Sequence, residues 1–256
     1  MDAVTLSWTT LLAITPVMLF AGLVHGALGL GFPLVATPLI AVFIDVRLAI
    51  IITLLPTAVV NVASITGQRN FRRVAIDYLP LALASTLGAL VGAAVLALSD
   101  TEIFRLLLAL LIFVFLWTQY RGNSSAEWLP GNRTLLLIFI GLLAGFAAGT
   151  TNVMVAILLI YFLTAGIARA EMVTAMNLCF LIGKLSQIVV FFITGLVSVT
   201  LLIETLPLAA VALGALLAGQ RIGDRIPQQR YRHWLQILLA VLAVILLLQF
   251  IIHTGT

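Results

Sequence analysis

Residues 172–194, MVTAMNLCFLIGKLSQIVVFFIT, form an apolar stretch that contains Lys184, the only lysine of the chain. A charged side chain near the centre of a bilayer costs roughly 2.5–3.5 kcal/mol on insertion scales, so such residues usually face a protein interior or a water-filled path. Asn177, Lys184 and Gln187 fall within about 80° of one another on a helix. One face of this stretch therefore carries an amide, an ammonium and a second amide, which is the chemistry of an anion-binding site.

A structural role is the alternative for Lys184. A lysine near the end of a span can extend its ammonium to the membrane surface, and a buried one can make a helix–helix contact. Lys184 lies near the middle of residues 172–194, too far from either end to reach the surface easily. We therefore predict that Lys184, Asn177 and Gln187 bind an anionic substrate.

The composition is that of an all-α polytopic membrane protein. The 256 residues are 63% apolar and 9% charged, whereas soluble domains carry about 25% charged residues. Spans and short loops use up the chain, which leaves no stretch for a soluble ATP-hydrolysing domain. The single cysteine excludes an internal disulfide and a multi-cysteine metal site. The N-terminal residues include no basic residue, so residues 8–27 are read as a retained segment and not as a signal peptide.

The first uncharged stretch, residues 3–44, is far too long for one span at about 1.5 Å per residue. Gly29, Gly31 and Pro33 predict a helix break near Gly29–Pro33, because glycine frees the backbone and proline removes a donor. A break at membrane depth is tolerated where protein or a water-filled cavity satisfies the freed groups. The N–H groups of the helix that follows favour anions, so Gly31 is a candidate substrate-binding residue.

The second uncharged stretch, residues 134–165, suits a hairpin of two short helices. Gly149 and the polar run Thr150, Thr151 and Asn152 predict its break. The three polar residues are further candidates for substrate binding. Whether residues 8–44 and 134–165 are full spans or re-entrant hairpins is left open by the sequence.

Polar residues also line one face of residues 48–66 and the position just beyond. Five of them share a face of about 80°: Thr53, Thr57, Asn61, Ser64 and Gln68. Serine and threonine can serve helix contacts alone, but so many polar side chains on one face predict a lined cavity. Thr57, Asn61 and Ser64 are therefore candidate substrate-binding residues.

His25 precedes the first break. Its unperturbed pKa of about 6.5 suits a group that couples transport to protons, and the alternative is a hydrogen-bonded structural histidine. Four glycines have the spacing of close helix contacts, and we predict that they serve packing: Gly22, Gly26, Gly88 and Gly92.

The chain contains an internal repeat, since DYLPLA at residues 77–82 matches ETLPLA at residues 204–209. We predict a first transmembrane repeat at residues 1–120, a cytoplasmic linker at 121–133 and a second repeat at 134–256. Each repeat has five apolar segments and opens with a broken or hairpin helix. Because five is odd, the second repeat has the inverted topology, as in many secondary transporters.

Arginines set the predicted orientation. Residues 68–73 and the basic loop 220–232 are rich in arginine, so both are placed in the cytoplasm. The two termini then lie outside the cytoplasm, in the periplasm of a bacterium. The basic isoelectric point thus reflects membrane topology and not a nucleic-acid surface.

The stretches GLVHGALGLGFPLVATPLI and AIIITLLPTAVVNVASITGQRNFRRV resemble the first half of the TauE/SafE sulfite exporter family. GLLAGFAAGTTN and EMVTAMNLCFLIGKLSQIVVFFITGLV are similar to that family's second repeat. The resemblance covers nearly the whole chain. It implies export of sulfite, a sulfonate or another small organic anion across the bacterial inner membrane, by alternating access and driven by the proton gradient.

Other functions fit the sequence less well. A passive anion channel or an uptake carrier for small organic acids would use the same chemistry. An intramembrane enzyme would need a nucleophile or base beside arginines or a metal, and the spans offer no acid cluster, so we predict no catalysis, cofactor or metal. The expected partners are the small anion and the bilayer. A homodimer is allowed by the sequence and not specified by it.

Overall fold

A computed structural model describes residues 7–66, 68, 70–121, 132–223 and 228–254. These residues form helices and no strand, which confirms the all-α class. The helices are α1 (Trp8–Leu28), α2 (Phe32–Ala41), α3 (Val46–Ile65), α4 (Phe71–Asp77), α5 (Leu79–Leu98), α6 (Glu102–Arg121), α7 (Arg133–Thr151), α8 (Val155–Thr164), α9 (Arg169–Ile193), α10 (Val199–Glu204), α11 (Leu206–Gly223) and α12 (Gln228–Thr254). Seven helical stretches of this part are long and apolar enough to cross a membrane. The predicted linker 121–133 lies almost entirely outside the described residues.

The first predicted break is confirmed. Helix α1 ends at Leu28, and Gly29 follows in the left-handed conformation with φ 82°. Gly31 has φ 104° and caps α2, whose proline falls in the first turn, where no intrahelical N–H is needed. Both glycines adopt backbone angles that side chains rarely allow, so the sequence itself determines this break.

The second break differs from the prediction of two short helices. Helix α7 has 19 residues, long enough to cross a membrane, and only α8 is short, with 10 residues. Gly149 is not at the break. It lies inside α7, where a Cβ would come within 2.5 Å of the Ala89 carbonyl oxygen on α5. The chain turns at Asn152, the last residue of the predicted break, which has φ 67°, because asparagine tolerates the left-handed region better than most residues.

The repeated Leu-Pro-Leu-Ala sequence begins a long helix in both halves. Helix α5 starts at Leu79 after the short α4, and α11 starts at Leu206 after the short α10. The predicted loop at residues 220–232 is too long, because α11 continues to Gly223 and α12 begins at Gln228. Residues 224–227 of that loop lie outside the described part.

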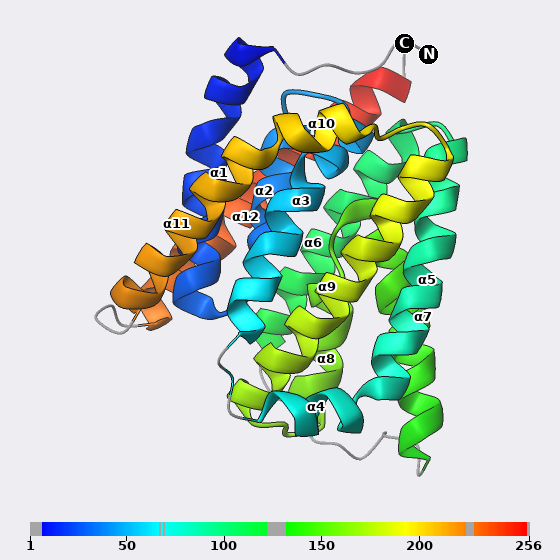
Figure 1. The fold of residues 1–256 in the computed structure, drawn as a ribbon, viewed down its shortest axis with the longest axis vertical. Coiled ribbons are helices and arrows are strands. Elements are labelled where there is room, and N and C mark those ends of the chain that lie inside the picture. Colours follow the sequence, from blue (N-terminus) through cyan, green and yellow to red (C-terminus); the bar gives the residue numbers. More distant parts are fainter. Residues whose placement is uncertain (1–6, 67, 69, 122–131, 224–227, 255–256) are drawn as a thin grey trace.

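Figure 1 shows that α4 and α10 lie at opposite ends of the bundle, whereas α1 begins and α12 ends at the same end. Helices of different halves pack together: α1 on α11, α7 on α5, and α6 on α12. Helices α3 and α9 pack against each other near the middle of the bundle. The inverted relation between the halves remains a prediction.

Glycines allow the closest of these contacts. A Cβ at Gly26 would overlap the Leu216 carbonyl oxygen on α11, and a Cβ at Gly145 would overlap the Ser85 carbonyl oxygen on α5. The four glycines predicted to serve packing all meet backbone of a neighbouring helix in this way: Gly22, Gly26, Gly88 and Gly92. That prediction is confirmed.

Candidate functional site

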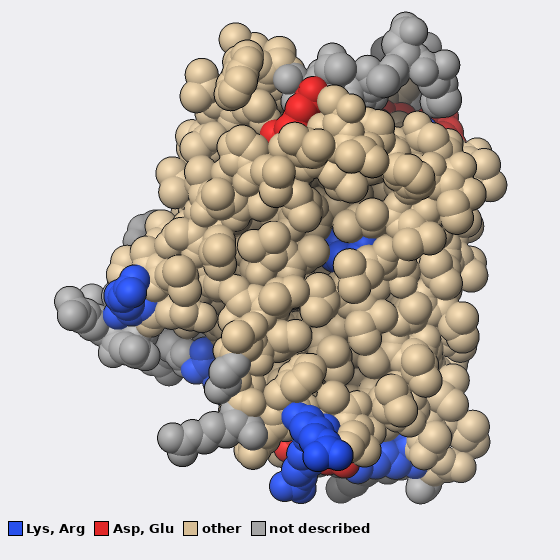
Figure 2. Space-filling model, in the orientation of Figure 1, with Lys and Arg blue, Asp and Glu red and all other residues tan. Residues whose placement is uncertain are grey.

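Lys184 lies on the buried face of α9, with 1% of its surface exposed. Its ammonium donates hydrogen bonds to the Asn152 Oδ1 and Gln187 Oε1 atoms. We call Lys184, Asn152, Gln187, Thr37 and Thr53 the lysine cluster. An ammonium has three N–H donors, and two of them are committed to neutral amide oxygens. Figure 2 shows basic atoms in a hollow over α9, in the middle of a face whose other charged atoms lie toward its ends and its edge.

The amide nitrogens of Asn152 and Gln187 are hydrogen-bonded as well as their oxygens. The Asn152 Nδ2 atom donates to the Thr37 and Thr53 hydroxyl oxygens, each at 2.9 Å. The Gln187 Nε2 atom donates to the Gly149 carbonyl oxygen at 2.8 Å. Both amide oxygens are therefore oriented toward the ammonium. Among the described residues no carboxylate forms an ion pair with Lys184.

A second group, which we call the asparagine cluster, lies nearer the α1–α2 break: Thr57, Asn61, Ser64, His25 and Asn177. The Phe32 N–H donates to His25 Nδ1 at 3.2 Å, so that nitrogen carries no proton. His25 Nε2 is 2.9 Å from the Ser64 hydroxyl oxygen. The Ser64 hydroxyl donates to the Val60 carbonyl at 2.8 Å, so Nε2 is the donor in this pair. His25 is thus held as the neutral Nε2–H tautomer.

The asparagine cluster contains buried polar atoms without a hydrogen-bond partner in the described structure. They are Thr57 Oγ1, Asn61 Nδ2, Asn61 Oδ1 and Asn177 Oδ1. The Asn177 Nδ2 atom donates to the carbonyls of Gly29 and Val173, each at 2.8 Å. Buried polar groups nearly always have a partner, so these atoms indicate a place that a ligand or water completes.

The structure places most of the predicted site residues in these two clusters and leaves Gly31, Thr150 and Thr151 outside them. Lys184, Gln187 and Asn152 lie together, whereas Asn177 is seven residues earlier on α9, about 10 Å along the axis. Thr150 and Thr151 bond to carbonyls of their own helix, at 2.9 and 2.8 Å.

Two residues of the lysine cluster were not among the predicted site residues. Thr37 is the only polar side chain in the α2 sequence FPLVATPLIA, and that isolation is the signal that could have identified it. Thr53 belongs to the polar face predicted for residues 48–66. Both are fully buried.

The family model for the sulfite exporter TauE/SafE matches residues 14–246. The chain belongs to the TauE/SafE family. The match covers both clusters and confirms the resemblance seen in the sequence. This TauE/SafE protein is therefore a multi-pass membrane protein of a transporter family whose name denotes sulfite export. No curated protein and no solved structure matches the chain.

Within the described part, no group of three or more His, Cys, Asp or Glu side chains could hold a metal ion.

Proposed function

We propose that this protein is a secondary transporter that exports a small sulfur-containing anion, such as sulfite or a sulfonate, across the bacterial inner membrane by alternating access. The observation that carries the proposal is the buried Lys184 ammonium, which has neutral partners and an uncommitted N–H. An uncompensated buried charge is costly. An anion would compensate this charge and accept the remaining hydrogen bond.

The two clusters give this anion a sequence of polar partners. Thr57 and Asn61 lie one turn apart on α3 and offer a hydroxyl and an amide without partners. Farther along the same α3–α9 interface lies the Lys184 ammonium. An anion that leaves the α1–α2 break would meet neutral donors first and the positive charge next. The path from the asparagine cluster to Lys184 is bordered by the two helix breaks. Gly31 lies at the first break and residues 150–152 lie at the second. We place the first break in a repeat at residues 1–120 and the second in a repeat at residues 134–256.

A thermal-shift panel tests the substrate class. Sulfite, sulfoacetate, taurine and thiosulfate are compared with simple carboxylates on the purified protein. A ligand at 100 times its Kd stabilises the folded state by about 2.7 kcal/mol, so at least one sulfur-containing anion should raise the melting temperature measurably. A shift with carboxylates alone would replace the proposed substrate class with that of a carrier for small organic acids.

Single cysteines test the orientation, in a Cys179→Ala background. Ser99 follows α5 and Ser198 precedes α10, which lies at the opposite end of the bundle from α4. Asn70 precedes α4, and Arg221 lies in the last turn of α11. We expect an impermeant thiol reagent added outside to label positions 99 and 198, and to label positions 70 and 221 only after permeabilisation. Positions 70 and 221 labelling from opposite sides would refute the inverted five-plus-five topology.

His25 is proposed to couple transport to the proton gradient. The Phe32 N–H donates to His25 Nδ1, so a proton on Nδ1 would point at another donor. Protonation of His25 therefore requires this hydrogen bond between α1 and α2 to break. Glutamine at position 25 can make both hydrogen bonds but cannot titrate near neutral pH. His25→Gln should therefore flatten the pH dependence of transport in proteoliposomes and leave substrate affinity nearly unchanged. The control is His253→Gln, an exposed histidine on α12; an unchanged profile in His25→Gln would make His25 structural.

A further inference from the structure

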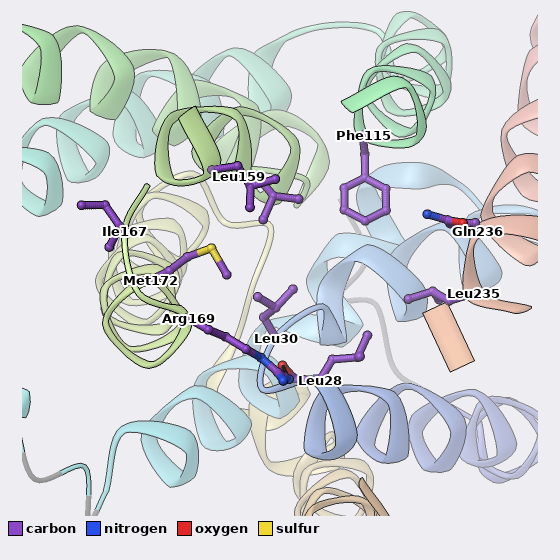
Figure 3. Close-up of a pocket in the computed structure, with 10 residues that line it drawn as sticks. Leu28, Leu30, Phe115, Leu159, Ile167, Arg169, Met172, Leu235 and Gln236 are labelled. Carbon is purple, nitrogen blue, oxygen red and sulfur yellow. Dashed lines mark hydrogen bonds between the residues drawn. The ribbon is translucent and has the colours of Figure 1, made fainter. Parts of the chain in front are cut away.

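A cavity of about 210 Å³ lies between the α1–α2 break, α6, α8, the start of α9 and α12. Its walls are almost entirely apolar, and Figure 3 shows their side chains converging from several helices on one space. A hydrocarbon occupant would gain dispersion contacts from such walls, whereas a water molecule would find few of the polar partners that it needs. The apolar lining residues include Leu28, Leu30, Phe115, Leu159, Leu163 and Met172.

The cavity has a positive charge at its edge, the exposed side chain of Arg169 at the start of α9. One nitrogen of its guanidinium donates to the Leu28 carbonyl at 3.1 Å (Figure 3). A guanidinium has five N–H donors, and among the described residues no carboxylate pairs with Arg169. The nearby Glu171 carboxylate accepts from the Tyr78 hydroxyl instead, at 2.9 Å. The cavity thus combines an apolar body with a cation that retains free donors.

The cavity lies just inside the level of the membrane surface. On α6, Phe115 lines the cavity, and Trp117 and Tyr120 follow with 58% and 88% of their surfaces exposed. Exposed tryptophan and tyrosine side chains gather where the hydrocarbon of a membrane meets water. They lie about 3–8 Å beyond Phe115 along the helix axis. The head group of a phospholipid and the first part of its acyl chain occupy this depth.

We propose that this cavity binds one acyl chain of an anionic phospholipid, whose phosphate contacts Arg169. Basic pockets between membrane helices on the cytoplasmic side bind acidic head groups, and α9 begins at the end that carries α4, which is predicted to be cytoplasmic (Figure 1). A zwitterionic lipid carries its own cation beside the phosphate, so the guanidinium favours a lipid with a net negative charge.

The lipid site is distinct from the proposed anion site. Arg169 precedes Lys184 by fifteen residues on α9, which is about 20 Å along the axis. The lipid would nevertheless touch the α1–α2 break, because Leu28 and Leu30 flank Gly29, whose carbonyl accepts a hydrogen bond from Asn177. An acyl chain in the cavity would therefore pack against the segment that borders the asparagine cluster.

Native mass spectrometry tests the preference for a negative head group. The full-length protein is released from nanodiscs that contain equal amounts of phosphatidylglycerol and phosphatidylcholine with the same chains, and the lipids that stay bound are identified. One basic side chain near the membrane surface should favour the anionic lipid about fivefold. Equal retention of the two lipids would overturn the proposal. The readout needs no transported anion, so its result is independent of the proposed function.

Two variants locate the site, each with a matched control. Arg169→Gln should lose the preference for phosphatidylglycerol, whereas Arg72→Gln, an exposed arginine on α4 and outside the cavity, should keep it. Leu163→Trp fills the cavity and should lose the retained lipid, whereas Leu143→Trp on an exposed face of α7 should keep it. Wild-type retention in either Arg169→Gln or Leu163→Trp would overturn the site.

Photolabelling locates the chain in the wild-type protein, where no substitution can disturb folding. A phosphatidylglycerol with a diazirine on its acyl chain is irradiated in the same nanodiscs, and the labelled peptides are mapped. We expect label on the cavity residues Leu159 and Met172, and an excess of unlabelled phosphatidylglycerol should remove it. Label confined to the outer face of α6, around Phe113 and Trp117, would overturn the proposal, because it reports only the lipid that surrounds the protein.

Discussion

Lys184→Met is expected to stay folded and to lose about one to two decades of affinity for the sulfur-containing anion. Methionine is similar in length to lysine, is apolar and is cheaper to bury. The variant loses a charge-assisted hydrogen bond, which contributes about 1.5–3 kcal/mol. It also frees the Asn152 and Gln187 amide oxygens that now accept from the ammonium. Isothermal titration of the purified, monodisperse variant measures the loss.

Further substitutions should rank in a defined order of affinity for the anion. Lys184→Arg should bind better than Lys184→Met but worse than wild type, because a planar guanidinium fills the site differently from a compact ammonium. Gln187→Leu should cost less than Lys184→Met, since it removes a neutral partner. Arg221→Met, at the end of α11, is the control and should keep wild-type affinity. If Lys184→Met binds as tightly as wild type, the lysine is structural and the site must be sought in the asparagine cluster.

The α5–α7 contact is expected to tolerate no side chain at Gly145. A Cβ there would overlap the Ser85 carbonyl oxygen. It would also lie 2.7 Å from the carbonyl carbon and from the Cα atom of Ser85. This neighbour is backbone, so relief requires the helices to separate. Overpacking costs about 1–3 kcal/mol, and Gly145→Ala should lower the melting temperature by about 2–12 °C. Gly26→Ala should do the same at the α1–α11 contact, where the neighbour is the Leu216 carbonyl oxygen.

Gly214→Ala is the matched control within the same set of helices. Gly214 lies in α11, and apart from its chain neighbours and the backbone of its own helix no described atom lies within 4 Å of a Cβ built there. Alanine is about 1 kcal/mol more favourable than glycine inside a helix, so the melting temperature should stay the same or rise. A Gly145→Ala protein as stable as Gly214→Ala would mean that α5 and α7 do not approach each other as closely as described.

The helix breaks of this fold could be predicted from the sequence where the local backbone conformation determines them. Gly29 and Gly31 have backbone angles that favour glycine, so the first break followed from composition alone. The second predicted break, at residues 149–152, contains the observed turn at Asn152. Gly149 is not part of that turn, because it resembles a helix breaker in sequence but serves a contact with α5. A glycine that relieves crowding and a glycine that ends a helix have the same sequence signal. The difference lies in a neighbour that is distant in the chain.

The site was predictable as a buried face but not as a set of contacts. A helical wheel places Asn177 with Lys184 and Gln187, and all three are indeed buried. The wheel ignores height along the axis, however, and seven residues separate Asn177 from the ammonium. Partners such as Thr37, on another helix, depend on tertiary packing that no single-helix pattern contains.

The central claim is that the protein carries a sulfur-containing anion bound at Lys184. The most direct test is counterflow in proteoliposomes preloaded with unlabelled sulfite or alkyl sulfonate, with the labelled anion outside. A carrier should accumulate label transiently, with a rate that saturates as substrate rises, and Lys184→Met should lose this uptake at concentrations that saturate wild type. Flux that rises linearly without transient accumulation would contradict the account, because it is the behaviour of a passive channel. Full counterflow in Lys184→Met would equally contradict it.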